Sequence, residues 1–180
     1  MSFYEAAPKI ISNKLALFGQ EPARFATRAI LAGVYLGIMT AFAATTAQLL
    51  DQYAPGWGRY AFAAIFASTL YIIIVLQGEL ATGDMMFMTY GSIHKLTSFW
   101  RGVLLVLFVT LFNLVGAVAI SWLISRTTMG HQFEADSFLH GLLVAKLQKS
   151  SSTLFVEAIL ANMVVNIAFM LATQAGKDYS

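Results

Sequence analysis

The sequence contains no cysteine, only three histidines and few charged residues. Without cysteine, neither a disulfide framework nor a thiolate metal site can form. Charged residues make up 11% of the 180 residues, whereas an ordinary soluble domain has about a quarter. This deficit indicates that lipid is the solvent for much of the chain. The formal net charge of +2 gives no indication of a nucleic-acid partner.

Four stretches lack Asp, Glu, Lys and Arg altogether, namely residues 29–50, 60–78, 102–125 and 158–176. Each can cross a hydrocarbon core about 30 Å thick, because roughly 20 helical residues span that distance. An outer-membrane barrel would instead show alternating segments of about ten residues. The sequence therefore predicts an all-α integral membrane protein of the inner-membrane type. We expect spans at about residues 28–50, 60–77, 102–125 and 155–175.

The segment before the first span has its own pattern, at about residues 5–23. Ile11, Leu15 and Phe18 recur there at helical spacing, beside Lys9 and Lys14. This pattern favours an amphipathic helix on the membrane surface. A loosely ordered arm is the alternative.

Positive residues are distributed unevenly among the connecting segments. The loop between the first two spans holds only Arg59. The basic residues on the other side are Lys9, Lys14, Arg24, Arg28, Lys95, Arg101 and Lys177. The positive-inside rule then places the N-terminus in the cytoplasm.

An interruption follows the second span, where the sequence QGELATGD occupies residues 77–84. Gly78 and Gly83 permit backbone angles that a helix does not use, and Thr82 or Asp84 could cap a short helix starting at Met85. We expect residues 78–84 to be non-helical within the membrane, in a broken-helix continuation that extends over 78–92. Such a break is tolerated only where protein or a wet cavity surrounds it. The alternative is a surface loop after Gln77.

Three motifs in this order resemble the formate/nitrite transporter family. Residues 78–82 (GELAT) are similar to the family pattern G-(A/S)-(D/E)-L-F-T, with Ala81 in place of Phe. Residues 113–117 (NLVGA) are similar to G-N-L-V-G-A, with Phe112 at the first Gly. Residues 160–165 (LANMVV) are similar to L-C-N-x-x-V, and Lys146 precedes Asn162 at the family's Lys-to-Asn separation.

The resemblance implies an aquaporin-like helical bundle with a broken second transmembrane helix. The family has six spans in two inverted halves, of which residues 1–180 would cover about four as a single transmembrane channel domain, truncated relative to the family. It also implies a homopentamer with one pore in each protomer. The family's pore histidine belongs to the fifth span. His94, His131 and His140 lie outside the four expected spans, so none is a substitute.

The resemblance also implies a set of pore-lining residues. Phe66 and Leu70 would form the cytoplasmic constriction, and Leu80, Ala81 and Val165 the periplasmic one. Thr82 would face the pore centre, while Lys146 and Asn162 would draw the anion inward. The residues expected to shape the break are Gly78, Glu79, Gly83 and Asp84.

Three of these positions, Ala81, Glu79 and Lys146, carry further expectations. The methyl group of Ala81 cannot close an aperture as a phenyl ring does, so the constriction is wider or another residue fills it. For Glu79 we favour a structural role, with the carboxylate accepting hydrogen bonds from loop amides. From charge statistics alone Lys146 is a surface cation; the family spacing favours the pore role.

The implied function is a channel or proton-coupled transporter for small monovalent anions, with formate ahead of nitrite and hydrosulfide third. A neutral-solute channel and a membrane anchor of a redox complex are alternatives. Haem anchors need axial ligands, commonly histidine, within their spans, and the four expected spans contain none. We expect no enzyme activity, catalytic residue, cofactor or metal. Met85, Met86 and Met88 lack the partner ligands of a soft-metal site. The implied location is a bacterial inner membrane, with the lipid bilayer as partner.

Overall fold

The computed structural model describes residues 3–133 and 137–175, and no strand occurs among them. Four helices are long and apolar enough to cross a membrane, counting α7 over its residues 151–174. The expected all-α, multi-pass membrane protein is therefore confirmed. Lys177 lies outside the described residues. The elements are α1 (Phe3–Gln20), α2 (Pro22–Tyr53), α3 (Gly58–Val75), α4 (Ala81–Ile93), α5 (Phe99–Ser125), the 3-10 helix η1 (Gly130–Gln132), α6 (Phe138–Leu147) and α7 (Ser151–Ala175).

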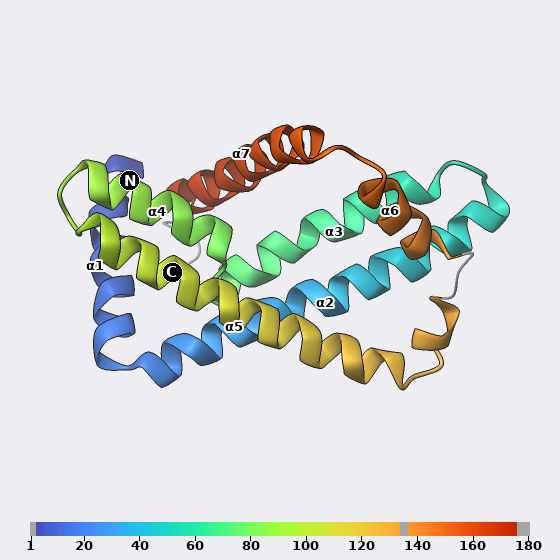
Figure 1. Ribbon diagram of the computed structural model, residues 1–180, viewed down its shortest axis with the longest axis horizontal. Helices are drawn as coiled ribbons and strands as arrows, with labels where there is room; N and C mark the ends of the chain where they lie inside the picture. The colour runs from blue at the N-terminus through green and yellow to red at the C-terminus, as the bar shows by residue number, and fades with distance from the viewer. Residues whose placement is uncertain (1–2, 134–136, 176–180) are drawn as a thin grey trace.

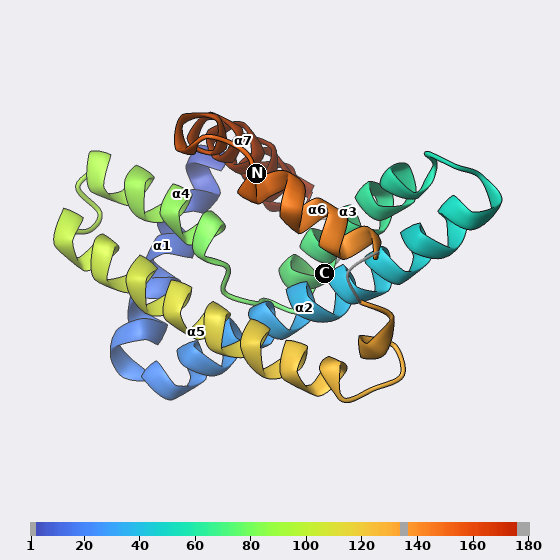
Figure 2. The same ribbon diagram turned by 45° about the vertical axis from the view of Figure 1, so that its right-hand side comes forward.

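Helices α2, α3 and α5 extend along the long axis of the molecule, and α1 lies across the end where α4 and α5 are joined (Figure 1). The turn between α2 and α3 lies at the opposite end in both views (Figure 2). Helix α5 packs against α2 and α4, and α7 contacts α3 and α4. The segment that connects α3 to α4 lies away from both ends of the long axis of the molecule (Figure 1).

The crossing of α2 and α5 brings the two backbones into contact. A Cβ atom added to Gly33 would lie 2.0 Å from the carbonyl oxygen of Asn113. One added to Gly116 would lie 2.0 Å from the carbonyl oxygen of Ile30. Small residues allow such close approach in membrane bundles, where dispersion contacts replace the hydrophobic effect between helices. This crossing brings the side chain of Asn113 within reach of α2.

The N-terminal segment forms helix α1, so it is not a loosely ordered arm. Ile11 and Leu15 are buried, as their spacing indicates, and Phe18 packs beside them. This face of α1 contacts buried side chains of α4 and α5, including Phe87, and forms one apolar cluster with them. The full set of buried members is Phe3, Ala7, Ile11, Leu15, Phe25, Ala29, Phe87, Met88, Leu105 and Val109.

The break between α3 and α4 is shorter than expected. It occupies residues 76–80, because α4 already begins at Ala81, so the prediction of a non-helical segment through Asp84 is wrong for 81–84. The amide of Asp84 donates to the carbonyl of Leu80 at 3.0 Å, which is the first helical bond of α4. The segment between α5 and α7 also contains η1 and α6, which the sequence analysis did not predict.

Candidate functional site at the helix break

The end of α3 is formed by Gln77, not by a glycine. Gln77 has a φ of 55°, in the left-handed region, and its amide donates to the carbonyl of Ile74 at 3.1 Å. The amide of Gly78 reaches back to the carbonyl of Ile73 at 2.8 Å. These two bonds are those of a Schellman motif, which satisfies carbonyls at a helix end. The expectation that Gly78 and Gly83 supply the unusual backbone angles is therefore wrong.

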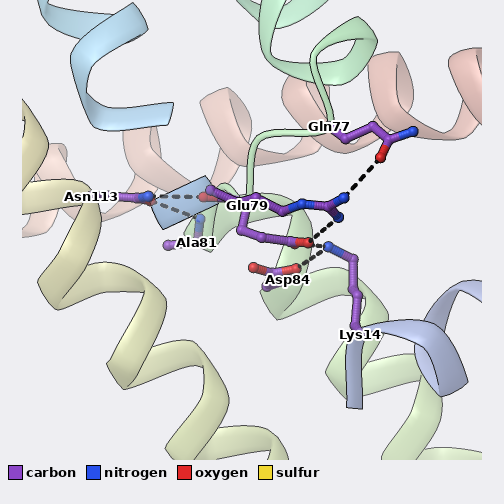
Figure 3. A network of polar contacts seen from close by, with 7 residues as sticks. Lys14, Gln77, Glu79, Ala81, Asp84 and Asn113 are labelled. Atoms are coloured by element: carbon purple, nitrogen blue, oxygen red, sulfur yellow. Dashed lines mark hydrogen bonds and ion pairs between the residues drawn. The ribbon is translucent and has the colours of Figure 1, made fainter. Parts of the chain in front are cut away.

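Asn113 joins the break to α2 and α5 (Figure 3). Its Nδ2 donates to the carbonyl oxygen of Ala29 at 2.7 Å and to that of Glu79 at 2.9 Å. Its Oδ1 accepts the amide of Ala81 at 3.0 Å. A hydrocarbon environment offers no water to replace such bonds. Asn113 therefore satisfies the first amide of α4, and for this reason the expected cap by Thr82 or Asp84 is absent from α4.

Two acidic side chains lie buried at the break, Glu79 within it and Asp84 in the first turn of α4, with a lysine between them (Figure 3). Lys14 Nζ lies 2.7 Å from Oδ1 of Asp84 and also contacts the carboxylate of Glu79. Arg28 lies 3.9 Å from Oε1 of Glu79 and donates to Oε1 of Gln77 at 3.0 Å. Two positive and two negative side chains thus balance, as buried charges require.

The charge of Lys14 is stabilised by this arrangement. Burial by itself would lower the pKa of the Lys14 ammonium group, but the carboxylates of Asp84 and Glu79 outweigh burial and raise this pKa above its usual value. Glu79 was expected to accept hydrogen bonds from loop amides. In the structure its carboxylate instead contacts cations from α1 and α2.

An apolar cluster also adjoins the break. Its buried members are Ala32, Ile73 and Leu80, and the partly buried side chains packed against them are Tyr35, Leu36, Leu70 and Phe169. Leu70 and Leu80, which the resemblance assigned to two constrictions, therefore belong to one cluster. Ala81 packs against the neighbouring cluster of α1, α4 and α5.

The remaining candidates are more scattered. The hydroxyl of Thr82 is buried and has no hydrogen-bond partner in the described part of the chain. The side chain of Phe66 is exposed and stacks on Phe62. Val165 lies partly buried on α7. These three positions stay predictions as pore-lining residues.

Lys146 and Asn162 are not joined by a hydrogen bond within the described ranges. Lys146 is exposed in the last turn of α6. Asn162 Nδ2 donates to the carbonyl of Ala158, in its own helix, at 2.8 Å. The neighbouring Lys149 binds both carboxylate oxygens of Glu157, at 2.7 and 2.8 Å. Lys149 is thus neutralised locally, whereas Lys146 has no ion pair among the described residues.

Sequence reasoning missed the site roles of Lys14, Arg28, Asn113 and Phe169. Lys14 carried a usable signal, because it lies three residues after Ile11 and so on the apolar side of the helix. Asn113 was noticed only as part of a motif. For Phe169 no sequence signal was available, since one more phenylalanine in an apolar span is unremarkable. No cluster of potential metal ligands occurs among the residues that the structure describes.

Comparison with known proteins agrees with the sequence motifs. The formate/nitrite transporter family model matches residues 3–180. The uncharacterized transporter YwcJ of Bacillus subtilis is 29% identical over 88% of this chain and 62% of its own length. The nitrite transporter NirC of Escherichia coli is 30% identical over 87% of this chain and 57% of its own length.

A probable formate transporter of Methanothermobacter thermautotrophicus is 30% identical over 71% of this chain and 47% of its own length. The chain therefore spans about 57 to 62% of the length of the first two relatives. The family match extends over nearly all of the chain, from the N-terminal helix to the last residue. The chain belongs to the formate/nitrite transporter family.

Proposed function

We propose that this protein is a membrane channel or transporter for small monovalent anions, with formate or nitrite as substrate and coupling to protons. The observation that carries the proposal is the helix break at residues 76–80, which is in contact with both an apolar cluster and a balanced polar network. Irregular backbone of this kind in a membrane bundle accompanies binding sites and passages. The relatives named as nitrite and formate transporters support the substrate class.

The apolar cluster suits a weak acid better than a permanent ion. An isolated ion in an apolar medium costs tens of kcal/mol by Born solvation, so an anion crosses more easily as its neutral acid. Leu70 and Leu80 would form apolar constrictions, with Phe66, Ala81 and Val165 beside them and Thr82 at the pore centre. Protonation would occur between entry and the constriction.

The outer mouth would hold Lys146 and Asn162. Lys149 is already paired with Glu157, whereas Lys146 has no ion pair among the described residues and so remains available to attract an anion. An anion beside a cation is harder to protonate. Attraction at Lys146 and protonation deeper in the passage are therefore separate steps.

The assembly and location belong to the same proposal. Residues 1–180 form a single transmembrane channel domain in a bacterial inner membrane, with the N-terminus in the cytoplasm and the bilayer as partner. The protein acts as a homopentamer and has no enzyme activity. Exposed apolar side chains on α5 and α7 support contact with lipid or neighbouring helices.

Liposome transport tests this proposal. Proteoliposomes should pass formate or nitrite, exclude sulfate, and respond to a pH gradient across the membrane. Hydrosulfide flux tests the nearest alternative substrate, and glycerol flux tests a neutral-solute channel. Equal flux of sulfate and formate would contradict narrow apolar constrictions, and glycerol flux without anion flux would favour the neutral-solute alternative.

A further inference from the structure

We infer that Phe169 on α7 is the aromatic side chain that narrows the passage beside the helix break and thereby selects anions by size. The inference rests on the proposed transport function and names a size-determining residue for it. Neither the motifs nor the pore-lining set assigned by resemblance includes Phe169. The surroundings of its ring and its position on α7 support this role.

The ring of Phe169 presses against the backbone of α4. A Cβ atom added to Gly83 would lie 2.9 Å from Cζ, 3.0 Å from Cε2 and 3.2 Å from Cε1 of this ring. Contacts under 3.0 Å essentially never occur for real Cβ atoms, so a side chain at position 83 would displace the ring. Gly83 is therefore small in order to make room for Phe169, one turn of helix after the break.

The same ring also packs against the apolar cluster that contains both leucines of the proposed constrictions. Phe169 contacts the buried group of Ala32, Ile73 and Leu80, as Leu70 does. The side chain of Phe169 on α7 thus reaches the point where α3 ends and α4 begins. Because interiors are close-packed, removing a phenyl group there opens space that the neighbours only partly refill.

One face of Phe169 borders a cavity of about 380 Å³. Gly78, Glu79 and Thr173 line it as well, together with Lys14 and Arg28. The ring therefore contacts the apolar cluster and also lines this cavity, whose walls carry both charged and apolar side chains. A solute that moves from the cavity toward the cluster would meet this ring.

The position of Phe169 along α7 agrees with this geometry. Phe169 follows Val165 by four residues and Asn162 by seven, so the three share one face of the helix. Asn162 and Val165 are the α7 residues proposed to line the pore. Ala81 provides only a methyl group at the break, and Phe169 offers the bulk that position 81 lacks.

The test compares the acetate-to-formate flux ratio in proteoliposomes. Phe169→Ala should raise this ratio on the order of tenfold, the scale on which hydrophobic pockets discriminate small groups. Phe169→Leu should give an intermediate ratio, because leucine fills part of the space. Phe155→Ala is the matched control, since Phe155 lies on the same helix and is 67% exposed. It should keep the parent ratio.

The outcomes separate this inference from the proposed function. A parent protein that passes neither formate nor nitrite rejects the proposed function. A parent that passes formate, with the parent ratio retained in assembled Phe169→Ala and Phe169→Leu, rejects the role of Phe169 alone. Failure of both variants to assemble would make Phe169 a folding residue and would also overturn the inference.

Discussion

The helix break and the α6–α7 region use polar side chains in opposite ways. At the break, Lys14, Asn113 and Glu79 contact groups far away in the sequence and join α1, α2 and α5 to α4. In the α6–α7 region, Asn162 bonds within its own helix and Lys149 binds Glu157 nearby. The break therefore depends on its polar groups for structure. In the second region, the exposed Lys146 has no ion pair among the described residues and is accessible to ions in solution.

The largest effect is expected from removing the cation at the break. Lys14→Met leaves the buried carboxylate of Asp84 without its cation and that of Glu79 with Arg28 alone, and losing one member of a buried ion pair costs about 3 to 5 kcal/mol. Thermal unfolding of the detergent-solubilised protein measures the loss. Lys9→Met is the control, because Lys9 is exposed on the same helix and should cost less than about 0.5 kcal/mol.

Removing the charges of the two carboxylates as well should restore part of the stability that Lys14→Met loses. Lys14→Met combined with Glu79→Gln and Asp84→Asn removes all three charges, so the unpaired carboxylates disappear. The triple variant should be more stable than Lys14→Met alone. If Lys14→Met unfolds at the parent temperature, the contacts of Lys14 contribute nothing and the comparison between the two regions fails.

The contribution of Lys14 has a definite pH dependence. Its pKa is raised in the folded protein, so its stabilisation is complete below the unfolded value of about 10.4 and is lost as pH rises through the raised pKa. The stability difference between the parent and Lys14→Gln should therefore not decrease as pH rises from about 6 to about 9, because the ammonium group of Lys14 stays charged throughout this range. A difference that disappears within this window would contradict the pairing.

Asn113 should show the next largest effect. Asn113→Leu keeps the volume but removes two donors and one acceptor, leaving the amide of Ala81 and the carbonyl of Glu79 without those partners. We expect a loss of about 1 to 3 kcal/mol, the cost of stranding buried polar groups. The amide of Ala81 should also exchange its hydrogen faster, which hydrogen–deuterium exchange measures.

Thr110→Val provides the matched control for this prediction. Thr110 lies on α5, three residues before Asn113, and within the described part of the chain its hydroxyl donates only to the carbonyl of Val106 in its own helix, at 2.8 Å. Its removal should change stability by less than about 0.5 kcal/mol. Equal losses in both variants would show that any polar group on α5 matters to the same degree.

The sequence predicted the long apolar helices because their signals are local. Stretches without charge mark the spans, and the spacing of Ile11 and Leu15 marks α1. The exact end of the break was not predictable, because the first amide of α4 is satisfied by Asn113 from another helix. The sequence pattern suggested Thr82 or Asp84 as the cap of α4, because the pattern of one segment does not show that a side chain from another helix bonds the first amide.

Site residues that belong to a local sequence motif could be predicted, whereas site residues that arrive through helix packing could not. Glu79 and Asp84 stood out as acids in an apolar region, but their partner Lys14 lies 65 residues before Glu79. Phe169 meets Gly83 only because α7 crosses α4. Contacts between distant segments depend on helix packing, which periodicity in one segment does not encode.

The smallest effect on stability is expected at Lys146, where the effect on transport should be clear. Lys146→Ala removes an exposed cation, so unfolding should change by no more than about 0.5 kcal/mol. Anion flux should fall and lose part of its ionic-strength dependence, since salt screens steering over roughly 8 to 10 Å. Lys146→Arg should retain the attraction while its planar guanidinium obstructs a narrow passage.

Lys149→Ala sharpens the interpretation of this last variant. It removes a cation of the same region that Glu157 already neutralises, so its flux should fall less than that of Lys146→Ala. Flux measured over a range of formate concentrations and salt concentrations distinguishes the two. If both variants lose flux equally, net charge near α6 matters and not the position of Lys146. If Lys146→Ala transports at the parent rate throughout, Lys146 is a surface lysine and the α6–α7 region does not steer the anion through it.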